Sequence, residues 1–405
     1  MSKIIIDDVV KDYGTFVALR GISLQVEEGE FVSLLGPSGC GKTSLLRSLA
    51  GLEDIQGGSI TVGEKVLSRE GYTVPPERRN VGLIFQSYAL WPHMTVFKNI
   101  AYGLSLRKWD KKRIKARVSE VLGVVGLEGL EDRLPAQLSG GQMQRVAVAR
   151  SLAAAPGVLL FDEPLSNLDA KLRETMRFEL RRIQKSVGTT AVYVTHDQAE
   201  AMVISDRIVL MNGGEIVQQG TARELYETPA SEFAAKFVGF SNLLPARAET
   251  VGVSGGVSTY RLDSKSAQLV AGRVRPGIAT GESVMLSVRP ECIRIKRLSE
   301  VDSNDSVVAL PSRIRDIVYA GNLCDVFLTV GEFKARAQVL PTEIEGFSPG
   351  EEVCAVFDSR SVWPVPRDVS AGDLDDTPPA PAAAVAGAEA ASPAPGMETT
   401  VLGQK

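Results

Sequence analysis

The stretch from Gly36 to Thr43 restricts the fold of this chain more than any other, because it matches the pattern G-x-x-x-x-G-K-[ST] of a phosphate-binding loop. The apolar run Phe31–Leu35 before it predicts a short buried strand, and residues 43–50 after it predict a helix that ends at Gly51. Glycines let the backbone approach phosphate oxygens closely, so that amide groups and the positive end of the helix dipole face the anion. We therefore expect an α/β fold built around this P-loop.

The loop also predicts how a nucleotide and Mg²⁺ are held. Lys42 adds a positive charge at the outer phosphates, and the Thr43 hydroxyl can act as a Mg²⁺ ligand. We expect the side chain of Cys40 to take no part in the chemistry. A glycine-rich turn that binds nothing is the alternative, and the predicted strand and helix on either side argue against it. The expected nucleotide-binding residues of the loop are Gly36, Pro37, Ser38, Gly39, Cys40, Gly41, Lys42, Thr43 and Ser44.

The composition limits the other possibilities. A length of 405 residues leaves room for two or three domains. The formal net charge of −4 argues against a nucleic-acid-binding surface, which usually shows a basic excess. The four cysteines form no C-x-x-C pair, so we expect reduced thiols in a cytosolic protein and no zinc site. The sequence contains neither a long apolar run nor a signal peptide, so we expect a protein that neither spans a membrane nor is exported.

Two carboxylates, an amide and an imidazole follow other predicted strands. Asp162 and Glu163 end an apolar strand; in P-loop enzymes an acid at this place holds the Mg²⁺ shell, and its neighbour can polarise a water aimed at the γ-phosphate. Gln86 follows the apolar run 81–85 and can bind Mg²⁺ or position water, and His196 follows the predicted strand 190–195. A lone glutamine or histidine at a strand end is usually structural, and two acids can belong to an ordinary turn. In a chain that also contains a P-loop earlier in its sequence, the acid pair strongly supports nucleotide chemistry.

A second helix start suits an anion. Ser139 and Gln142 form an S-x-x-Q capping box at the start of a helix that runs to Ala155. That structural reading leaves Gly140 and Gly141 unexplained, because glycine is a poor helix former. Glycines there leave amide groups uncovered for an approaching anion, so the capping and functional readings are compatible.

Two further features allow more than one reading. Tyr13 could stack on an adenine ring or could simply cover a strand edge, and the residues alone do not separate the two. The basic residues between Lys108 and Arg117 recur on one predicted helix over 110–125, and the overall charge favours a solvated face over a nucleic-acid patch.

Residues 1–239 resemble the ATP-binding subunit of an ABC transporter, with a helical subdomain at about 87–155. The resemblance rests on the P-loop, Gln86, the Leu138–Gln142 signature, the acid pair, the Ser166–Asp169 loop and His196, in family order and spacing. It implies that Glu163 is the catalytic base, that His196 senses the γ-phosphate, and that Gln86 couples nucleotide state to membrane subunits. It also implies nucleotide contacts from Tyr13, Ser139, Gly140, Gly141, Gln142 and Asp169, and Mg²⁺ contacts from Thr43, Gln86 and Asp162.

The second half, residues 240–367, predicts a small β-barrel, because short strands alternate with turn signals. Asp325–Val330 and Phe333–Gln338 flank a two-residue turn and predict a hairpin. This half resembles the OB-like (TOBE) regulatory domain of importer ATPases, and Ser287–Glu291 is similar to a segment typical of that domain. Residues 368–405 are rich in Ala and Pro, and we expect a disordered tail.

The resemblance implies an ATP-hydrolysing subunit of a solute importer, at the cytoplasmic face of the inner membrane, using ATP and Mg²⁺. It is closest to importers of polyamines or ferric iron, and relatives for sugars, sulfate or phosphonate share most of the same features. The implied partners are a second copy, joined by ATP, two membrane-spanning permease subunits near Gln86, and a solute-binding protein reached through the permease. Two other classes stay open: an ABC ATPase acting on nucleic acid through its OB-like domain, although no nucleic acid is expected, and a nucleotide-binding regulator without turnover.

Overall fold

The structure is a computed structural model, which describes residues 2–251, 257–263, 269–301 and 307–367. All of these residues belong to one compact unit, Met1–Asp368. The tail expected at 368–405 lies outside the described residues.

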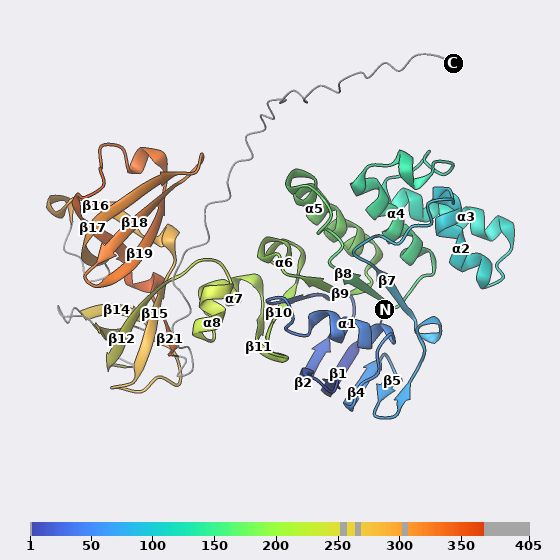
Figure 1. The fold of residues 1–405 in the computed structure, drawn as a ribbon, viewed down its shortest axis with the longest axis horizontal. Helices are drawn as coiled ribbons and strands as arrows, with labels where there is room; N and C mark the ends of the chain where they lie inside the picture. Colours follow the sequence, from blue (N-terminus) through green and yellow to red (C-terminus); the bar gives the residue numbers. More distant parts are fainter. Residues whose placement is uncertain (1, 252–256, 264–268, 302–306, 368–405) are drawn as a thin grey trace, which may run out of the picture. The chain divides into compact units, whose positions relative to one another are not determined.

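The central sheet of the N-terminal half has six strands in the order β11-β10-β3-β9-β8-β7 (Figure 1). β3 (Phe31–Leu35) lies between β10 and β9 and is parallel to both, and β8 and β7 continue in the same direction. β3 is buried along its whole length, which explains a sequence that is apolar at every position except Ser33 and confirms the predicted strand. The other strands are β7 (Val81–Ile84), β8 (Val158–Asp162), β9 (Thr190–Thr195), β10 (Arg207–Asn212) and β11 (Glu215–Gly220).

The register of these parallel strands brings their carboxyl ends to one edge. Leu35 at the end of β3 pairs with Thr195 of β9, and Asp162 of β8 pairs with Val194 of β9. The P-loop, His196 and Glu163 therefore begin next to one another, at the edge where open α/β sheets bind their ligands.

A second, antiparallel sheet completes this half, in the order β2-β1-β4-β5-β6. Its β2 includes the alternating apolar and polar run from Ile22 to Val26. The sheet shares a hydrophobic core with α1 and the middle strands of the central sheet. Its strands are β1 (Ile4–Asp12), β2 (Val17–Val26), β4 (Gly57–Val62), β5 (Lys65–Arg69) and β6 (Tyr72–Thr73).

The helices follow the predicted patterns closely. α2, α3 and α4 contact one another, and α4 also contacts β7 (Figure 1). On α5 an apolar stripe is buried at its centre, at Met176, Leu180 and Ile183, and partly exposed at its two ends. No helix in the described part of the chain has both the length and the apolar character needed to cross a membrane. The helices are α1 (Lys42–Ala50), α2 (Val96–Leu106), α3 (Lys111–Val125), α4 (Gly140–Ala153), α5 (Ala170–Val187), α6 (Gln198–Ile204), α7 (Ala222–Glu227) and α8 (Glu232–Phe237).

The C-terminal half is all-β, as expected. Two five-stranded antiparallel sheets, β14-β13-β12-β15-β21 and β16-β20-β17-β18-β19, share one hydrophobic core. The predicted hairpin is β18–β19, in which Val330 pairs with Phe333 across the turn. The strands are β12 (Asn242–Thr250), β13 (Val257–Leu262), β14 (Leu269–Arg273), β15 (Ser283–Val288), β16 (Arg294–Lys296), β17 (Val307–Tyr319), β18 (Cys324–Val330), β19 (Phe333–Val339), β20 (Glu352–Asp358) and β21 (Trp363–Pro366).

Candidate nucleotide site

The P-loop connects β3 to α1 and folds around its own lysine. Lys42 is only 6% exposed, and its Nζ donates to the carbonyl oxygens of Gly36 at 2.7 Å and Pro37 at 2.8 Å. The Sγ of Cys40 lies 3.6 Å from the same nitrogen. All three partners are neutral, so an anionic phosphate would be a stronger partner for this ammonium group.

The start of α1 is open to an anion. Of the eight α-helices in the described part of the chain, only α1 has an N-cap residue, Gly41, that offers no side-chain hydrogen bond. Gly41 has a φ of +100°, and a Cβ there would lie 2.4 Å from the carbonyl oxygen of Ala18. A Cβ at Gly39 would meet no atom of the described residues beyond its chain neighbours within 4 Å, so the space beside this residue is open. The uncapped amides and the empty space fit a phosphate group.

Asp162 and Glu163 end β8 beside the P-loop. Burial, with a smaller contribution from the charge of Glu163, raises the pKa of Asp162, against the opposing effects of Arg47 and a hydrogen bond from Thr43. The carboxylate of Asp162 and the hydroxyl of Thr43 therefore lie together, and hard oxygen donors of this kind suit Mg²⁺. No group of three or more His, Cys, Asp or Glu among the described residues could hold a metal ion alone.

Glu163 adopts a left-handed backbone conformation with a φ of +44°. A non-glycine residue pays for such a conformation with about 1–3 kcal/mol, so the surroundings must hold it in place. The Glu163 amide donates to the Val194 carbonyl at 3.1 Å, and the Glu163 carbonyl accepts from the amide and the hydroxyl of Ser166 at 3.3 and 2.9 Å. These bonds fix the direction of the Glu163 side chain.

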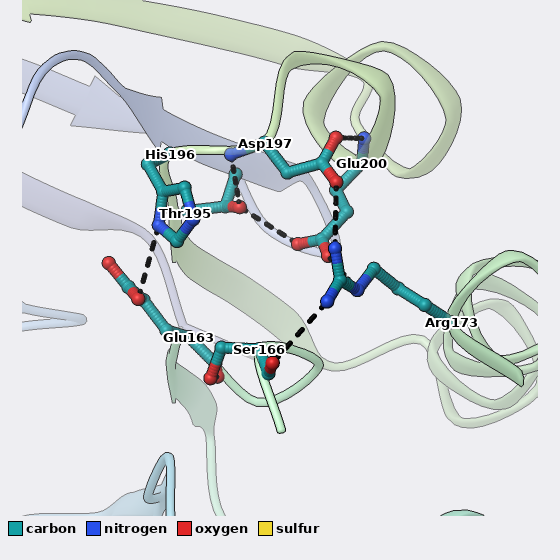
Figure 2. Close-up of a pocket in the computed structure, with 7 residues that line it drawn as sticks. All are labelled: Glu163, Ser166, Arg173, Thr195, His196, Asp197 and Glu200. Atoms are coloured by element: carbon teal, nitrogen blue, oxygen red, sulfur yellow. Dashed lines mark hydrogen bonds and ion pairs between the residues drawn. The ribbon is translucent and has the colours of Figure 1, made fainter. Parts of the chain in front are cut away.

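The Glu163 carboxylate points toward His196, as Figure 2 shows, with 3.2 Å between Oε2 and Nδ1. The His196 side chain is 58% exposed and that of Glu163 is 24% exposed. Both groups therefore face solvent at the sheet edge, where a water and a phosphate could reach them. A carboxylate here can take a proton from water, and an imidazole can donate a hydrogen bond to a phosphate oxygen.

Arg173 of α5 lies beside this pair in the pocket of Figure 2. Its Nη2 donates to the carbonyls of Ser166 at 3.3 Å and Leu168 at 3.0 Å, and its Nη1 lies 3.6 Å from Oδ2 of Asp197. Arg173 thus joins the loop after Glu163 to the residue after His196.

Glu200 of α6 holds the end of β9 through three hydrogen bonds. Its Oε2 accepts from the hydroxyls of Tyr193 at 2.7 Å and Thr195 at 2.8 Å, and its amide donates to Asp197 at 3.1 Å. Burial raises the pKa of Glu200, although both hydroxyl bonds lower it. The end of β9, which carries His196, is therefore held by a buried polar network.

Tyr13 contacts the P-loop helix. Its hydroxyl lies 3.1 Å from the Ser44 hydroxyl and also donates to Glu53, and its ring stacks on Phe16 at 5.1 Å. Burial, followed by the Glu53 hydrogen bond, raises the pKa of Tyr13. The ring is exposed beside the nucleotide cradle, and adenine stacking stays a prediction.

Gln86 lies two residues beyond the end of β7 and is exposed. Its carbonyl accepts from Nδ2 of Asn167 at 2.9 Å, which ties it to the loop after Glu163. Asp169 in that loop caps α5 by accepting from the Leu172 amide at 2.9 Å.

The predicted capping box at Ser139 is confirmed. Ser139 Oγ accepts from the Gln142 amide at 3.3 Å, and Gln142 Oε1 accepts from the Ser139 amide at 2.9 Å. The two glycines also have a packing role that the sequence analysis missed, because a Cβ at Gly140 would lie 2.9 Å from Leu168 and one at Gly141 would lie 3.1 Å from Leu172. No hydrogen bond among the described residues joins this helix start to the P-loop of the same chain.

Comparison with known proteins places this geometry in a family. Residues 19–166 match the ABC transporter family, and residues 286–364 match the TOBE domain. The sn-glycerol-3-phosphate import ATP-binding protein UgpC of Brucella abortus (strain 2308) is 53% identical over 240 residues, covering 59% of this chain and 67% of that protein. The Fe(3+) ions import ATP-binding protein FbpC of Rhizobium etli is 50% identical over 71% of this chain and 78% of that protein. The spermidine/putrescine import ATP-binding protein PotA of Thermotoga maritima is 43% identical over 82% and 88%.

The chain belongs to the ATP-binding proteins of ABC transporters. The fold class expected from the sequence is confirmed: an ABC-type P-loop domain is followed by an all-β TOBE-containing half. Within this ABC protein, the P-loop, the acid pair and His196 meet at one sheet edge, whereas the Ser139 helix start packs on the loop that follows the acid pair.

The sequence analysis missed Arg173, Asp197 and Glu200. One signal was available, because Asp197-x-x-Glu200 is an acidic N-cap followed by an acid three residues later, the pattern of a helix start. Nothing local marked Arg173, whose partner Asp197 lies on another element.

Proposed function

We propose that this chain is the ATP-hydrolysing motor subunit of an ABC solute importer. The observation that carries the proposal is the Glu163 carboxylate, held by its backbone bonds 3.2 Å from His196 at the edge where the P-loop begins. A base, a hydrogen-bond donor and a phosphate cradle at one edge are the parts that phosphoryl transfer to water needs.

In the proposed reaction, Glu163 accepts a proton from a water that attacks the γ-phosphorus, as the bond between that phosphorus and the ADP oxygen breaks. His196 donates a hydrogen bond to the γ-phosphate, and Lys42 exchanges its carbonyl partners for the outer phosphate oxygens. Thr43, Asp162 and Gln86 would hold Mg²⁺, which would supply positive charge against the negative charge of the phosphates. The backbone of residues 36–44 wraps the phosphates, with the N–H groups of all these residues except Pro37 as donors, and Tyr13 stacks on the adenine.

The direct test of this chemistry is Glu163→Gln, which keeps the shape and removes the base. We expect ATP to bind as before while phosphate release slows by about 10²–10⁴-fold. Glu64→Gln, in an exposed turn, is the matched control and should release phosphate at the wild-type rate. Near wild-type turnover of the Glu163 variant would remove this residue from the mechanism.

We also propose that each ATP site is shared by two copies of the chain. Ser139 is exposed at the start of α4, and this helix start makes no hydrogen bond to its own P-loop among the described residues. The capping box uses the Ser139 and Gln142 amides, so the Ser139 hydroxyl and the amides of Gly140 and Gly141 are the donors for a partner's γ-phosphate. Gln142 and Asp169 lie at the same face of the dimer. ATP then joins the two copies, and ADP releases them.

Mixed dimers test the sharing. Ser139→Arg should abolish hydrolysis while the chain still binds ATP, and Lys42→Ala should weaken ATP binding. Mixing the two variants should restore activity, because one site then combines Lys42 of one chain with Ser139 of the other. A Glu163→Gln chain that stays monomeric with ATP at high concentration, with membrane partners present, contradicts the shared site.

We propose that this chain works at the membrane together with permease subunits and a solute-binding protein. Two permease subunits contact the surface near Gln86 at the cytoplasmic face of the inner membrane, and a solute-binding protein delivers the solute from the other side. We propose a polyamine such as spermidine or putrescine, or ferric iron, as the solute, in line with the names of two relatives. A sugar, sulfate, phosphonate or glycerol phosphate importer is the alternative, and uptake of each labelled solute by cells lacking this chain separates them.

A further inference from the structure

The segment that joins Gln86 to α2 contains an unusual backbone. Tyr88 and Ala89 are consecutive non-glycine residues with φ values of +60° and +48°. A Cβ disfavours this left-handed region, so two such residues in a row persist only where neighbouring groups hold them. The Tyr88 side chain adds a second cost, because it is 7% exposed and its buried hydroxyl has no hydrogen-bond partner in the part of the chain that the structure describes.

Arg150 of the signature helix α4 holds this bend. Its Nη1 donates to the Ala89 carbonyl at 2.5 Å and its Nη2 donates to the Tyr88 carbonyl at 2.9 Å. The guanidinium also lies over the Trp91 ring, 5.2 Å from its centroid. Burial lowers the pKa of Arg150, so the bend is held by a cation that has given up much of its hydration.

The two ends of the segment are anchored separately. Asn167 donates to the Gln86 carbonyl at 2.9 Å. Asn99, which is fully buried, accepts from the Trp91 amide at 2.9 Å and donates to the Trp91 carbonyl at 3.2 Å. Between these anchors, Arg150 supplies both side-chain hydrogen bonds that the structure gives to the two left-handed carbonyls.

We propose that Arg150 is a positioning residue, which keeps the Tyr88–Ala89 bend left-handed and thereby places Gln86 at the nucleotide site. Without the fork of donors, the bend relaxes toward the right-handed or extended region, and the chain direction at Gln86 changes with it. Ser139 and Arg150 lie at the beginning and near the end of the same helix, so a shift of the signature also moves the bend. This inference rests on the proposed role of Gln86 and adds the residue that sets its position.

The first test is Arg150→Lys, which keeps the charge but loses the planar fork. We expect kcat for ATP hydrolysis to fall at least about tenfold, with the KM for ATP within about twofold of wild type, because the cradle itself is intact.

Rescue by glycine distinguishes positioning from general stability. Ala89→Gly removes the share of the left-handed cost that falls on Ala89, so the bend depends less on the clamp and the Arg150→Lys, Ala89→Gly double variant should recover part of its kcat. Ala155, also exposed and with a φ of +49°, gives the matched control Ala155→Gly. It should raise the melting temperature similarly without restoring kcat. Equal rescue by both glycines, or rescue by neither, overturns the inference.

A second pair of variants keeps the test valid if Arg150→Lys fails to fold. Valine is strongly disfavoured at positive φ, so Ala89→Val should lower kcat at constant KM, whereas Ala155→Val should lower only the melting temperature. A wild-type kcat for Ala89→Val contradicts the proposal.

Failure of the proposed function gives a different result. If Gln86→Ala hydrolyses ATP normally, the role of Gln86 is wrong and the positioning argument falls with it. If Gln86→Ala is impaired while both the Arg150 and Ala89 variants are normal, only the positioning role of Arg150 is wrong.

Discussion

Lys42 of the P-loop and Arg289 of the C-terminal half are two cations with the same exposure, 6% each, and with opposite surroundings. Lys42 is a point charge with two carbonyl partners and a thiol. Arg289 donates to the carbonyls of Tyr226, Ala235 and Phe240, and its guanidinium lies 3.9 Å from the centroid of the Tyr226 ring. The lysine can exchange its neutral partners for an anion, whereas the arginine is saturated and stacked.

The helices around the two cations also differ in whether their first amides are capped. α1, which contains Lys42, has no side-chain N-cap. α7 and α8, which carry two of the carbonyls bound by Arg289, are capped by Thr221 and Ser231. The Tyr226 hydroxyl also has its own partner, because it donates a hydrogen bond to Glu291. Burial, followed by this hydrogen bond, raises the pKa of the Tyr226 hydroxyl. Burial of a charge therefore does not by itself indicate a ligand site; unused hydrogen-bonding capacity around the charge does.

Of the variants that test this comparison, Arg289→Ala should show the largest change, a loss of stability. The carbonyls of Tyr226, Ala235 and Phe240 lose this donor and the guanidinium leaves a void where it was buried, so we expect the free energy of unfolding to fall by about 3–4 kcal/mol, with ATP affinity unchanged. Denaturant titration with calorimetry of ATP binding measures both, and Arg294→Ala, an exposed arginine of β16, is the control. A loss of ATP affinity without a loss of stability would make Arg289 a ligand residue after all.

Lys42→Ala should show the reverse pattern, with a somewhat smaller free-energy change. Removing a charged donor from the phosphate cradle should weaken ATP binding by about 10–100-fold, while the melting temperature changes little. Lys111→Ala, in an exposed turn of α3, should leave ATP affinity unchanged. Unaltered affinity of the Lys42 variant by calorimetry counts against the P-loop assignment.

Glu200→Gln extends the comparison to a buried anion and should have the smallest effect. Its pKa is raised in the folded state, so ionisation above about pH 4.5 costs the wild type stability as the pH rises, and glutamine avoids that cost. The amide oxygen can still accept from Tyr193 and Thr195. We expect the variant to become more stable relative to wild type as the pH rises from about 4.5 to about 8. Melting curves across this range measure it, and a difference that shrinks with pH would argue against the raised pKa.

Sequence reasoning succeeded where structure depends on neighbours in the chain. The β3 strand, the Ser139 capping box and the β18–β19 hairpin follow from local period, capping and turn residues. The sequence also predicted that the acid pair and His196 follow strands whose carboxyl ends lie together, because parallel strands end at one edge of the sheet. The catalytic roles assigned to these residues stay predictions.

The remaining features depend on partners far apart in the sequence. Arg150 and the bend carbonyls are 61 and 62 residues apart, and Arg289 lies 63 residues from Tyr226. The residues next to an arginine in the sequence do not show that its side chain will reach a carbonyl in a distant segment. In the same way, neither the residue type nor its neighbours predict that an alanine or a tyrosine will have a left-handed backbone. The close packing of Gly140 on Leu168 was missed for the same reason.

The left-handed backbone of Glu163 has a consequence for protein engineering. Glycine, and to a lesser degree asparagine, fits that conformation better than glutamate, so selection for heat resistance alone would favour replacing this residue. Selection for turnover would keep the carboxylate. Libraries of this ATPase screened only for thermal tolerance should therefore accumulate inactive chains altered at position 163, and a thermostable variant that retains Glu163 must have gained its stability elsewhere.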